Sequence, residues 1–484
     1  MEDMMADYML DDIDYEQEYY DDMMEYDDSM MEEGAVYTRL PLTQVFEQCM
    51  LPTIQQTAGS VLPLMVLCIV CKMCANLCTE SIDDREDIAF PKVTFHLSSA
   101  ICGLMACHLF FHADLLYMLM LGILAYTMLA LANWKCRQFC GSGVAVITVL
   151  YLLICELFLV EGEKWHQIRG AQMVLAMKVI SVGFDLSNSS IEKLPAPWEF
   201  LGYIFNVGTV IFGPFVSFTD YSAVLLQSER LITWHFIKRL LGSFAISLVC
   251  VVISACVTYW LILDDSGSWM LAYRDAQSFR FSHYFISFLS EVTTLCSGLS
   301  WVIRGNIRDI NVSRPYHIEL PRSLVEVVSK WNLPMHYWLK TYVFKSAIGL
   351  GNFTAILLTY IASAILHGLN FQLAAVLLSL GFYTYTEYVL RKRLSRIFDA
   401  CIQAKKCKED CTHQFKSSHI YVRVVNVFFG CLAMFHLAYL GMMFDGSATT
   451  EQGYTMEHTL SKWAHLGYMS HIVAIGSYIF YFLI

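Results

Sequence analysis

The chain has 484 residues, of which 56% are hydrophobic and only 16% charged, and its mean hydropathy is +0.47. Soluble globular proteins average about 45–50% apolar and about 25% charged residues, so this composition excludes an ordinary soluble protein. The net charge is −12, but residues 1–33 carry 15 Asp and Glu and no Lys or Arg, which leaves 29 acidic and 32 basic residues elsewhere. Without a long basic patch to neutralise phosphates, nucleic-acid binding is disfavoured.

The distribution of apolar residues predicts two regions. Residues 1–35 combine the acidic run with scattered Met and Tyr, which is typical of a disordered tail. Residues 36–484 predict one all-α polytopic membrane domain with about eleven transmembrane helices, since a span takes roughly 20 apolar residues. The candidate spans are 58–78, 94–112, 114–133, 142–160, 199–218, 240–263, 283–303, 341–366, 371–390, 421–444 and 467–484.

Two further segments are only partly apolar. Residues 165–186 mix Arg169, Lys178 and Asp185 with Met and Val, which predicts either an interfacial helix or one that lines a polar interior. Residues 306–336 are too polar to span and predict a loop region that leads into the next apolar run.

The apolar stretch 353–390 is interrupted only by the turn 367–370. Gly and Asn in this turn predict a tight hairpin between two helices, because both residues tolerate a positive φ. Four residues of the first helix share one face: Tyr360, Ser363, Ala364 and His367. An ionisable residue within a membrane segment indicates function, and imidazole suits general-base chemistry near neutral pH.

A purely structural interpretation of the same residues stays open. His367 can be a core histidine with satisfied hydrogen bonds, as is expected of His96, His108, His436 and His471. Asn332 can simply cap a helix that begins near Pro334, since Asn is favoured at the N-cap. Periodicity alone does not decide between these interpretations.

Long blocks of the sequence carry a resemblance to a known family. They include Ser313-Arg314-Pro315, Glu319-Leu320-Pro321-Arg322-Ser323, Trp331-Asn332-Leu333-Pro334-Met335, Leu366-His367-Gly368 and Leu390-Arg391-Lys392-Arg393-Leu394. These blocks resemble the membrane-bound O-acyltransferase (MBOAT) family, and within it the branch that acylates a serine of secreted Wnt proteins. The resemblance covers about residues 40–484 and leaves out the acidic tail.

The resemblance implies a helical fold around an internal reaction tunnel and an enzyme of the endoplasmic reticulum membrane. It implies transfer of palmitoleate from palmitoleoyl-CoA, as co-substrate, to a serine hydroxyl of a Wnt protein. His367 matches the family's catalytic histidine, and Asn332 matches its second polar residue. A base at His367 would take the serine proton, and Asn332 would donate a hydrogen bond to the oxyanion or to the thioester.

Substrate-binding residues are expected around these two. Trp331, Tyr360 and Ser363, with Ala364, are predicted to shape the acyl pocket, although simple packing explains Tyr360 and Ser363 equally well. Arg322 and the basic run 391–393 are candidates for the phosphates of coenzyme A. The basic run also has a topological explanation, because Lys and Arg accumulate on the cytosolic side of spans.

The 17 cysteines separate into two groups. Most lie in apolar runs, Cys256 among them, where cysteine behaves as a small hydrophobic residue. Four possible metal ligands follow the basic run in a short polar loop: Cys401, Cys407, Cys411 and His413. Three thiols and one imidazole match the ligand set of a structural zinc site, with His419 as an alternative fourth ligand. Unliganded loop cysteines are the other possibility.

Two other classes of function compete with an enzyme. A polytopic transporter can use His367 to gate or relay protons, and Glu156 and Glu291 keep that hypothesis open. A membrane chaperone without catalytic activity can use the same tunnel for a lipidated partner protein. The absence of a visible internal repeat disfavours the transporter, and the intact blocks at Asn332 and His367 disfavour the chaperone.

Overall fold

The computed structural model describes residues 39–84, 89–226, 234–299, 301–303, 306–308, 310–408, 410–444 and 456–484. The predicted disordered tail 1–35 lies outside the described residues. The chain divides into two units, Met1–Gln48 and Cys49–Ile484. Of the first unit, residues 39–48 are described, and they hold α2 (Leu42–Val45) and the beginning of the π-helix η1 (Phe46–Met50).

The second unit is helical, as predicted. Its first half contains α3 (Leu51–Asp84), α4 (Ala89–Phe111), α5 (Leu115–Lys135), α6 (Cys140–Ile154), α7 (Gly162–Ser187), α8 (Pro197–Ile204), α9 (Val207–Val210), α10 (Phe218–Ser222), α11 (Trp234–Val252), α12 (Thr258–Leu261) and α13 (Ser268–Cys296). Short 3₁₀ or π segments join them: η2 (His112–Asp114), η3 (Arg137–Phe139), η4 (Cys155–Leu159), η5 (Ala223–Leu226) and η6 (Ile253–Val257).

The second half begins with a small antiparallel ribbon of β1 (Trp301–Ile303) and β2 (Asn306–Arg308), in which Val302 pairs with Ile307. The helices that follow are α14 (Tyr316–Glu319), α15 (Leu324–Trp331), α16 (Leu333–Trp338), η7 (Leu339–Phe344), α17 (Lys345–Ala347), η8 (Ile348–Leu350), α18 (Asn352–Leu366), α19 (Phe371–Ile397), α20 (Ile420–Gly441), α21 (Met456–His465) and α22 (Met469–Leu483).

Within the described residues, seven helical stretches are long and apolar enough to cross a membrane, or eight if the bent pair α21 and α22 counts as one span. The protein is therefore a multi-pass membrane protein, but the count of eleven spans is not confirmed. The stretch Lys92–Lys135 is 44 residues long and contains both predicted spans 94–112 and 114–133. At about 1.5 Å per residue it is too long for one crossing, and the 3₁₀ turn η2 divides it.

Three predicted spans are not continuous apolar helices. Residues 199–218 are interrupted after α8 and again at Gly213, which has a positive φ and precedes Pro214. Residues 341–366 are divided at Gly351, again with a positive φ, and residues 283–303 are only partly helical, at the end of α13. Hydropathy averages over such breaks, so it does not show whether each apolar segment is one continuous span.

The partly polar segment 165–186 forms most of α7, and it lies inside the protein. Of its apolar window 78% is buried, compared with 28–39% for the other six candidate spans. Lys178 is buried and donates to the carbonyls of Tyr203 and Ile204 and to the hydroxyl of Thr209. The polar-interior alternative is therefore confirmed over the interfacial one.

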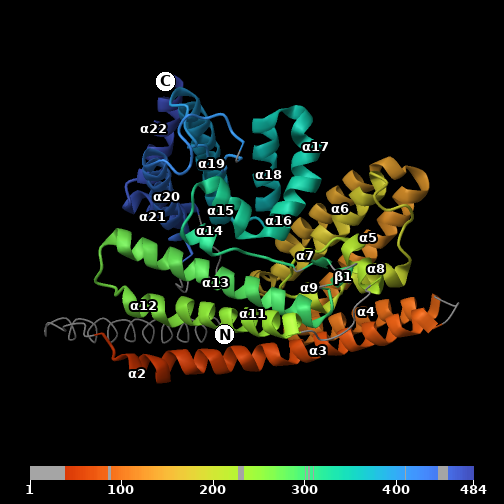
Figure 1. Ribbon diagram of the computed structural model, residues 1–484. Helices are drawn as coiled ribbons and strands as arrows, with labels where there is room; N and C mark the ends of the chain where they lie inside the picture. Colours follow the sequence, from red (N-terminus) through yellow and green to blue (C-terminus); the bar gives the residue numbers. More distant parts are fainter. Residues whose placement is uncertain are drawn as a thin grey trace, which may run out of the picture. The chain divides into compact units, whose positions relative to one another are not determined.

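Two large hydrophobic cores organise this unit (Figure 1). The first core is formed mainly by helices α3 through α9, and the second mainly by helices α19 through α22. Helix α13 packs against α11 and α3 on one side and α20 on the other, so it connects the two cores. Helices α15 to α18 lie between them in the chain and in space, and they carry the residues that the sequence singled out.

One cysteine prediction is wrong. Cys256 is not a free hydrophobic thiol but forms a disulfide with Cys49, 207 residues earlier in the chain. Its apolar sequence context gave no indication of this partner, because only the tertiary fold brings Cys49, which lies just before α3, beside Cys256 of η6.

Candidate active site

A large cavity of about 1670 Å³ lies between the two cores. Its wall includes Met177 of the first core and Val376 of the second. All six predicted catalytic and substrate-binding residues line it: Arg322, Trp331, Asn332, Tyr360, Ser363 and His367. Typical ligand pockets measure about 300–1,000 Å³, so this space is large enough for more than one small ligand.

His367 lies at the predicted hairpin turn between α18 and α19. Its backbone N–H donates to the Ser363 carbonyl at 3.2 Å, and it forms the C-cap of α18. Gly368 follows with φ +93°, a conformation that residues with a Cβ rarely adopt. Asn370 then begins α19, because its Oδ1 accepts the N–H of Leu373 at 3.1 Å.

A carboxylate from a distant helix fixes this turn. Glu156, in η4, accepts the N–H of Leu369 through Oε1 at 2.8 Å. A Cβ on Gly368 would lie 2.7 Å from the same Oε1 and 3.2 Å from Cδ of Arg169. Glycine is therefore required here both for its backbone conformation and for the approach of Glu156.

Asn332 is a helix cap, and its other amide atom remains available. It lies between α15 and α16, where its Oδ1 accepts the N–H of Met335 at 3.0 Å. The capping interpretation is therefore confirmed. A carboxamide also carries two N–H donors on nitrogen, and the cap uses only the oxygen. The cap thus fixes the oxygen of a cavity-lining side chain whose nitrogen can still donate.

The sequence did not single out His283, which lines the same cavity from α13. Its ring stacks on Trp331 with centroids 4.2 Å apart and planes inclined by 7°. Its Nε2 lies 2.9 Å from the carbonyl oxygen of Trp331, so the neutral ring can donate to the peptide immediately before Asn332. His283, Ser287 and Ser290 recur at helical spacing, which was the available signal in the sequence.

Tyr360 and Ser363 lie on the cavity-lining face of α18, whereas Ala364 is buried outside the lining. Gly381 of α19 lies opposite Tyr360, and a Cβ there would approach the ring to 2.9 Å. The width of the cavity at this point is therefore set by the absence of a side chain on α19.

The arginines predicted for phosphate binding are tied to the protein itself. Arg391 is completely buried and pairs with Glu387 at 2.8 Å, so the prediction that it binds coenzyme A is wrong. Arg322 lines the cavity but donates from Nη2 to the Cys401 carbonyl at 2.7 Å and from Nε to the Gln403 carbonyl at 3.2 Å. Other basic residues also line the cavity and are at least partly exposed: Lys330, Lys340, Lys392, Arg393, Arg396, Lys405 and Lys406.

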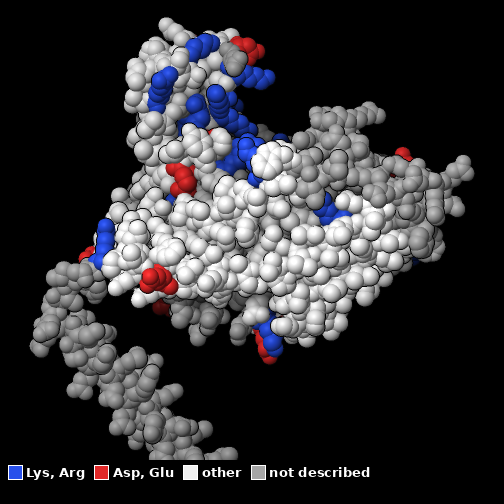
Figure 2. All heavy atoms as spheres, turned by 60° about the horizontal axis from the view of Figure 1, so that its bottom comes forward, with Lys and Arg blue, Asp and Glu red and all other residues white. Residues whose placement is uncertain are grey.

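Figure 2 shows Lys and Arg side chains gathered in a recess beside the C-terminal helices, above a face that is mostly uncharged. A concentrated basic region next to a mostly uncharged face favours a polyanionic ligand. Glu156 and Glu291, the two carboxylates that left the transporter hypothesis open, hold backbone segments in place in the structure. Glu156 holds the turn at Leu369, and Glu291 accepts the N–H of Val312 at 2.9 Å and pairs with Arg239 at 3.0 Å.

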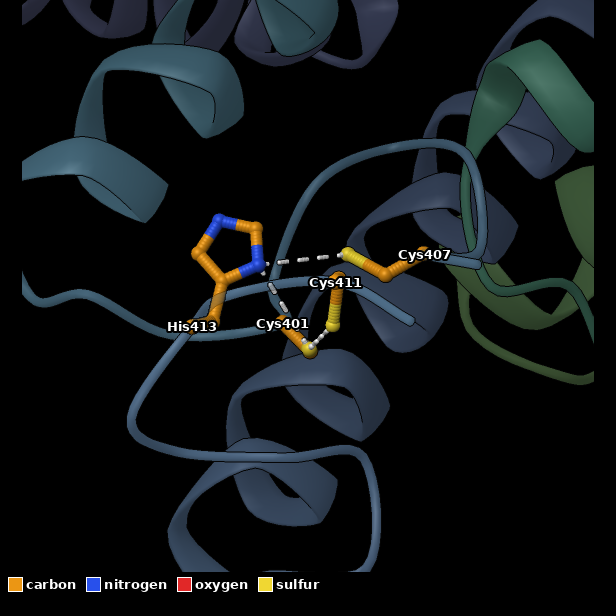
Figure 3. Close-up of side chains that lie close together, drawn as sticks. All are labelled: Cys401, Cys407, Cys411 and His413. Atoms are coloured by element: carbon orange, nitrogen blue, oxygen red, sulfur yellow. Dashed lines mark hydrogen bonds between the residues drawn. The ribbon is translucent and has the colours of Figure 1, made fainter. Parts of the chain in front are cut away.

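The four predicted metal ligands come together in the loop between α19 and α20 (Figure 3). One donor atom from each of Cys401, Cys407, Cys411 and His413 lies within 4.8 Å of the other three. Nδ1 of His413 lies 3.7 Å from the Cys401 sulfur and 3.8 Å from the Cys407 sulfur. His419 is not part of the cluster and instead packs against Phe415.

The surroundings of the cluster match those of a metal site. Nε2 of His413 lies 3.1 Å from the Ser395 hydroxyl, and metal-binding imidazoles commonly have such an outer partner. Hydrogen bonds with His413 and Cys401 lower the pKa of the Cys411 thiol to about 7. Burial and the neighbouring thiols raise the pKa of Cys401 to about 12.

Comparison with known proteins agrees with the resemblance seen in the sequence. Residues 149–407 match the membrane-bound O-acyltransferase family. Protein-serine O-palmitoleoyltransferase porcupine of Mus musculus is 41% identical over 91% of this chain and 97% of its own length, and the Homo sapiens protein gives the same figures. The porcupine protein of Drosophila melanogaster is 31% identical over 97% of this chain and 92% of its own length.

The matched region contains every cavity-lining residue that the sequence singled out, from Arg322 to Arg393. It also ends at Cys407, within the loop that carries the cysteine cluster. On these matches, the chain belongs to the membrane-bound O-acyltransferase family.

Proposed function

We propose that this protein transfers palmitoleate from palmitoleoyl-CoA to a serine hydroxyl of a Wnt protein, with His367 as general base. The observation that carries the proposal is the position of His367 and Asn332 on the wall of one large cavity. The cavity is apolar inside and has basic residues among its lining. The similarity to protein-serine O-palmitoleoyltransferases supplies the acyl group and the class of acceptor.

The reaction is an acyl transfer from sulfur to oxygen. His367 takes the proton of the serine hydroxyl as that oxygen attacks the thioester carbonyl. The carbon–sulfur bond then breaks, and the coenzyme A sulfur leaves with the proton that His367 holds. A positioned base contributes about 10²–10⁴-fold to such a reaction.

Asn332 supports the same step through its carboxamide nitrogen. With Oδ1 fixed by the Met335 N–H, the nitrogen can donate to the oxyanion that develops on the thioester carbonyl. Removing one donor of this kind typically costs about 2.7–4 kcal/mol of transition-state stabilisation. His283 holds the preceding peptide through Trp331, so it helps to orient the donor.

The phosphates of coenzyme A bind the exposed basic residues that line the cavity, such as Lys392, Arg393, Lys405 and Lys406. Arg322 can offer a phosphate only its remaining nitrogen, since Nε and Nη2 already donate to loop carbonyls. The acyl chain then lies in the apolar part, between Trp331 and the Tyr360 and Ser363 face of α18.

The cellular setting follows from the two substrates. Acyl-CoA is cytosolic and Wnt proteins are secreted, so the active site has to be reachable from both sides of the endoplasmic reticulum membrane. An internal tunnel through the protein would meet this requirement, and the large cavity within this multi-pass helical protein is where we propose that it runs.

A structural zinc ion at Cys401, Cys407, Cys411 and His413 is a second part of the proposal. Three thiols and one imidazole with converging donor atoms form a closed, four-ligand set, which is the pattern of structural rather than catalytic zinc. The measurement is the metal content of the purified protein by inductively coupled plasma mass spectrometry. About one equivalent of zinc per chain is expected.

The test of the catalytic proposal is an acyl-transfer assay in detergent with palmitoleoyl-CoA and a Wnt-derived serine peptide. His367→Ala is expected to lose at least about a hundredfold in kcat while remaining folded. His436→Gln is the matched control, because His436 is a buried histidine outside the cavity lining, bonded to Ser470 at 2.6 Å. A folded His367→Ala that transfers at the wild-type rate would remove His367 from the mechanism.

A further inference from the structure

The loop between α19 and α20 presents a run of backbone carbonyls to the segment that carries the catalytic residues. Four consecutive residues of this loop contribute, Cys401 to Ala404, and Cys401 is itself one of the four metal ligands. Their partners are the side chains of Arg322, Ser323 and Arg391.

The first contacts hold the beginning of α15. Arg322 donates to the carbonyls of Cys401 and Gln403, and the Ser323 hydroxyl donates to the Ala404 carbonyl at 2.9 Å. The same hydroxyl caps α15 by accepting the N–H of Glu326 at 3.1 Å. The N-terminal end of α15 is thus attached directly to the loop.

The buried side chain of Arg391 also connects the loop to the residues just before α15. Arg391 donates from Nε to the Ile402 carbonyl at 2.7 Å and from Nη1 to the Arg322 carbonyl at 2.6 Å. Its ion-pair partner Glu387 accepts the N–H of Leu324 at 2.7 Å. A buried charge requires these partners in place, so the loop carbonyls are part of what keeps the network intact.

The segment held in this way ends at the active site. Helix α15 runs from Leu324 to Trp331, and Asn332 follows it at once. Eight helical residues span about 12 Å and behave as one rigid piece. Displacement of the N-terminal end of α15 therefore moves Trp331 and Asn332 as well.

Little regular structure holds the loop itself. Among its described residues, strand-like pairing is limited to one bridge between Ala400 and Phe415, and a small apolar cluster that includes Ile402 and Val422 packs against it. The four metal ligands lie at both ends and in the middle of the same stretch, so one ion would connect residues 401 to 413.

We propose that the zinc-bound loop is a clasp that positions α15, and with it Asn332, for the reaction. The inference rests on the zinc ion and the acyl transfer proposed above. With the metal bound, the carbonyls of Cys401 to Ala404 stay aligned on Arg322 and Arg391. Without it, the carbonyls lose their alignment and α15 loosens. The cysteines act through Arg322 and α15, so they are positioning residues and not catalytic ones.

The test combines three measurements on the full-length protein: zinc content, hydrogen exchange of the α15 amides, and acyl transfer. In Cys407→Ser we expect loss of zinc, exchange at least about tenfold faster in residues 324–331, and a lower kcat. Cys431→Ser is the matched control, because Cys431 is an exposed free cysteine outside the cluster, and it should leave all three unchanged.

Arg322→Met removes the side-chain contacts between Arg322 and the loop without removing a metal ligand. It should retain zinc and still show faster exchange in α15, and combining it with Cys407→Ser should add little, since both act on one connection. If either variant folds poorly, chelating the wild type with a membrane-permeable ligand and restoring it with zinc chloride gives the same comparison.

Each outcome has a distinct meaning. Zinc loss with unchanged exchange in α15 would overturn the clasp and leave the zinc site standing. Wild-type protein without zinc would overturn both the metal site and the metal dependence. Absence of transfer by folded wild type would overturn the proposed function, while the exchange data would still decide whether the loop positions α15.

Discussion

Replacing Gly368 by alanine tests whether the turn after His367 positions this histidine, the proposed catalytic base. The added Cβ would lie 2.7 Å from Oε1 of Glu156, closer than real Cβ contacts, and Glu156 would have to move away. Its hydrogen bond to the N–H of Leu369 at 2.8 Å would then be lost. The variant therefore disturbs both the conformation and the anchor of the turn.

The two effects have different magnitudes. A residue with a Cβ at φ +93° costs about 1–3 kcal/mol in conformational strain. Loss of a hydrogen bond to a charged group adds about 1.5–3 kcal/mol. A displacement of about 1 Å at a catalytic group can lower the rate about 100-fold. We expect Gly368→Ala to lose about 100-fold in kcat for peptide acylation and to unfold at a lower temperature.

Gly351→Ala is the matched control, at the other end of the same helix. Gly351 has φ +100°, so alanine meets the same kind of backbone strain, but no atom lies within 4 Å of the added Cβ. We expect a similar loss of thermal stability from strain alone, with kcat within a few-fold of wild type. The reasoning would be refuted if both variants lost activity equally, or if Gly368→Ala remained fully active.

Substitutions at three further positions test residues that line the cavity or hold its wall. Gly381→Ala places a Cβ 2.9 Å from the Tyr360 ring and so narrows the pocket. We expect kcat/KM to shift by about 10-fold toward acyl-CoA chains that are shorter by one or two methylenes. An unchanged chain-length profile would show that Gly381 and Tyr360 do not limit the acyl pocket. His283→Phe retains the stack on Trp331 but loses the hydrogen bond to the Trp331 carbonyl. We expect kcat to fall about 5-fold, which corresponds to about 1 kcal/mol. A wild-type kcat would show that His283 does not position Asn332. Glu156→Ala should lower kcat more than Glu156→Gln, because glutamine keeps an acceptor for the Leu369 N–H. Equal rates in the two variants would show that this hydrogen bond is not needed for activity.

Features that depend on neighbouring residues in the chain were predictable from the sequence. The membrane class follows from composition, and the turn at His367 follows from Gly368 and Asn370 within an apolar stretch. The cap at Asn332 and the cysteine cluster were also found, because helix caps and short metal-ligand loops depend on residues close in sequence.

The breaks in three predicted spans were missed for a related reason. A hydropathy average records how apolar a segment is, but not whether its backbone continues as one helix. Gly213 lies outside any helix, and Gly351 separates η8 from α18. Both glycines have a positive φ inside an apolar run, where the sequence shows only another glycine.

Only the tertiary structure decided which distant groups meet. Glu156 holds a turn 213 residues away, His283 holds Trp331 from 48 residues away, and Arg391 reaches the carbonyl of Arg322 across 69 residues. These contacts depend on how whole helices pack, and a carboxylate or imidazole has the same local sequence whether it relays protons or anchors a backbone. The chain sequence therefore determined the chemistry of the site, and packing between distant helices determined which charged residues support it.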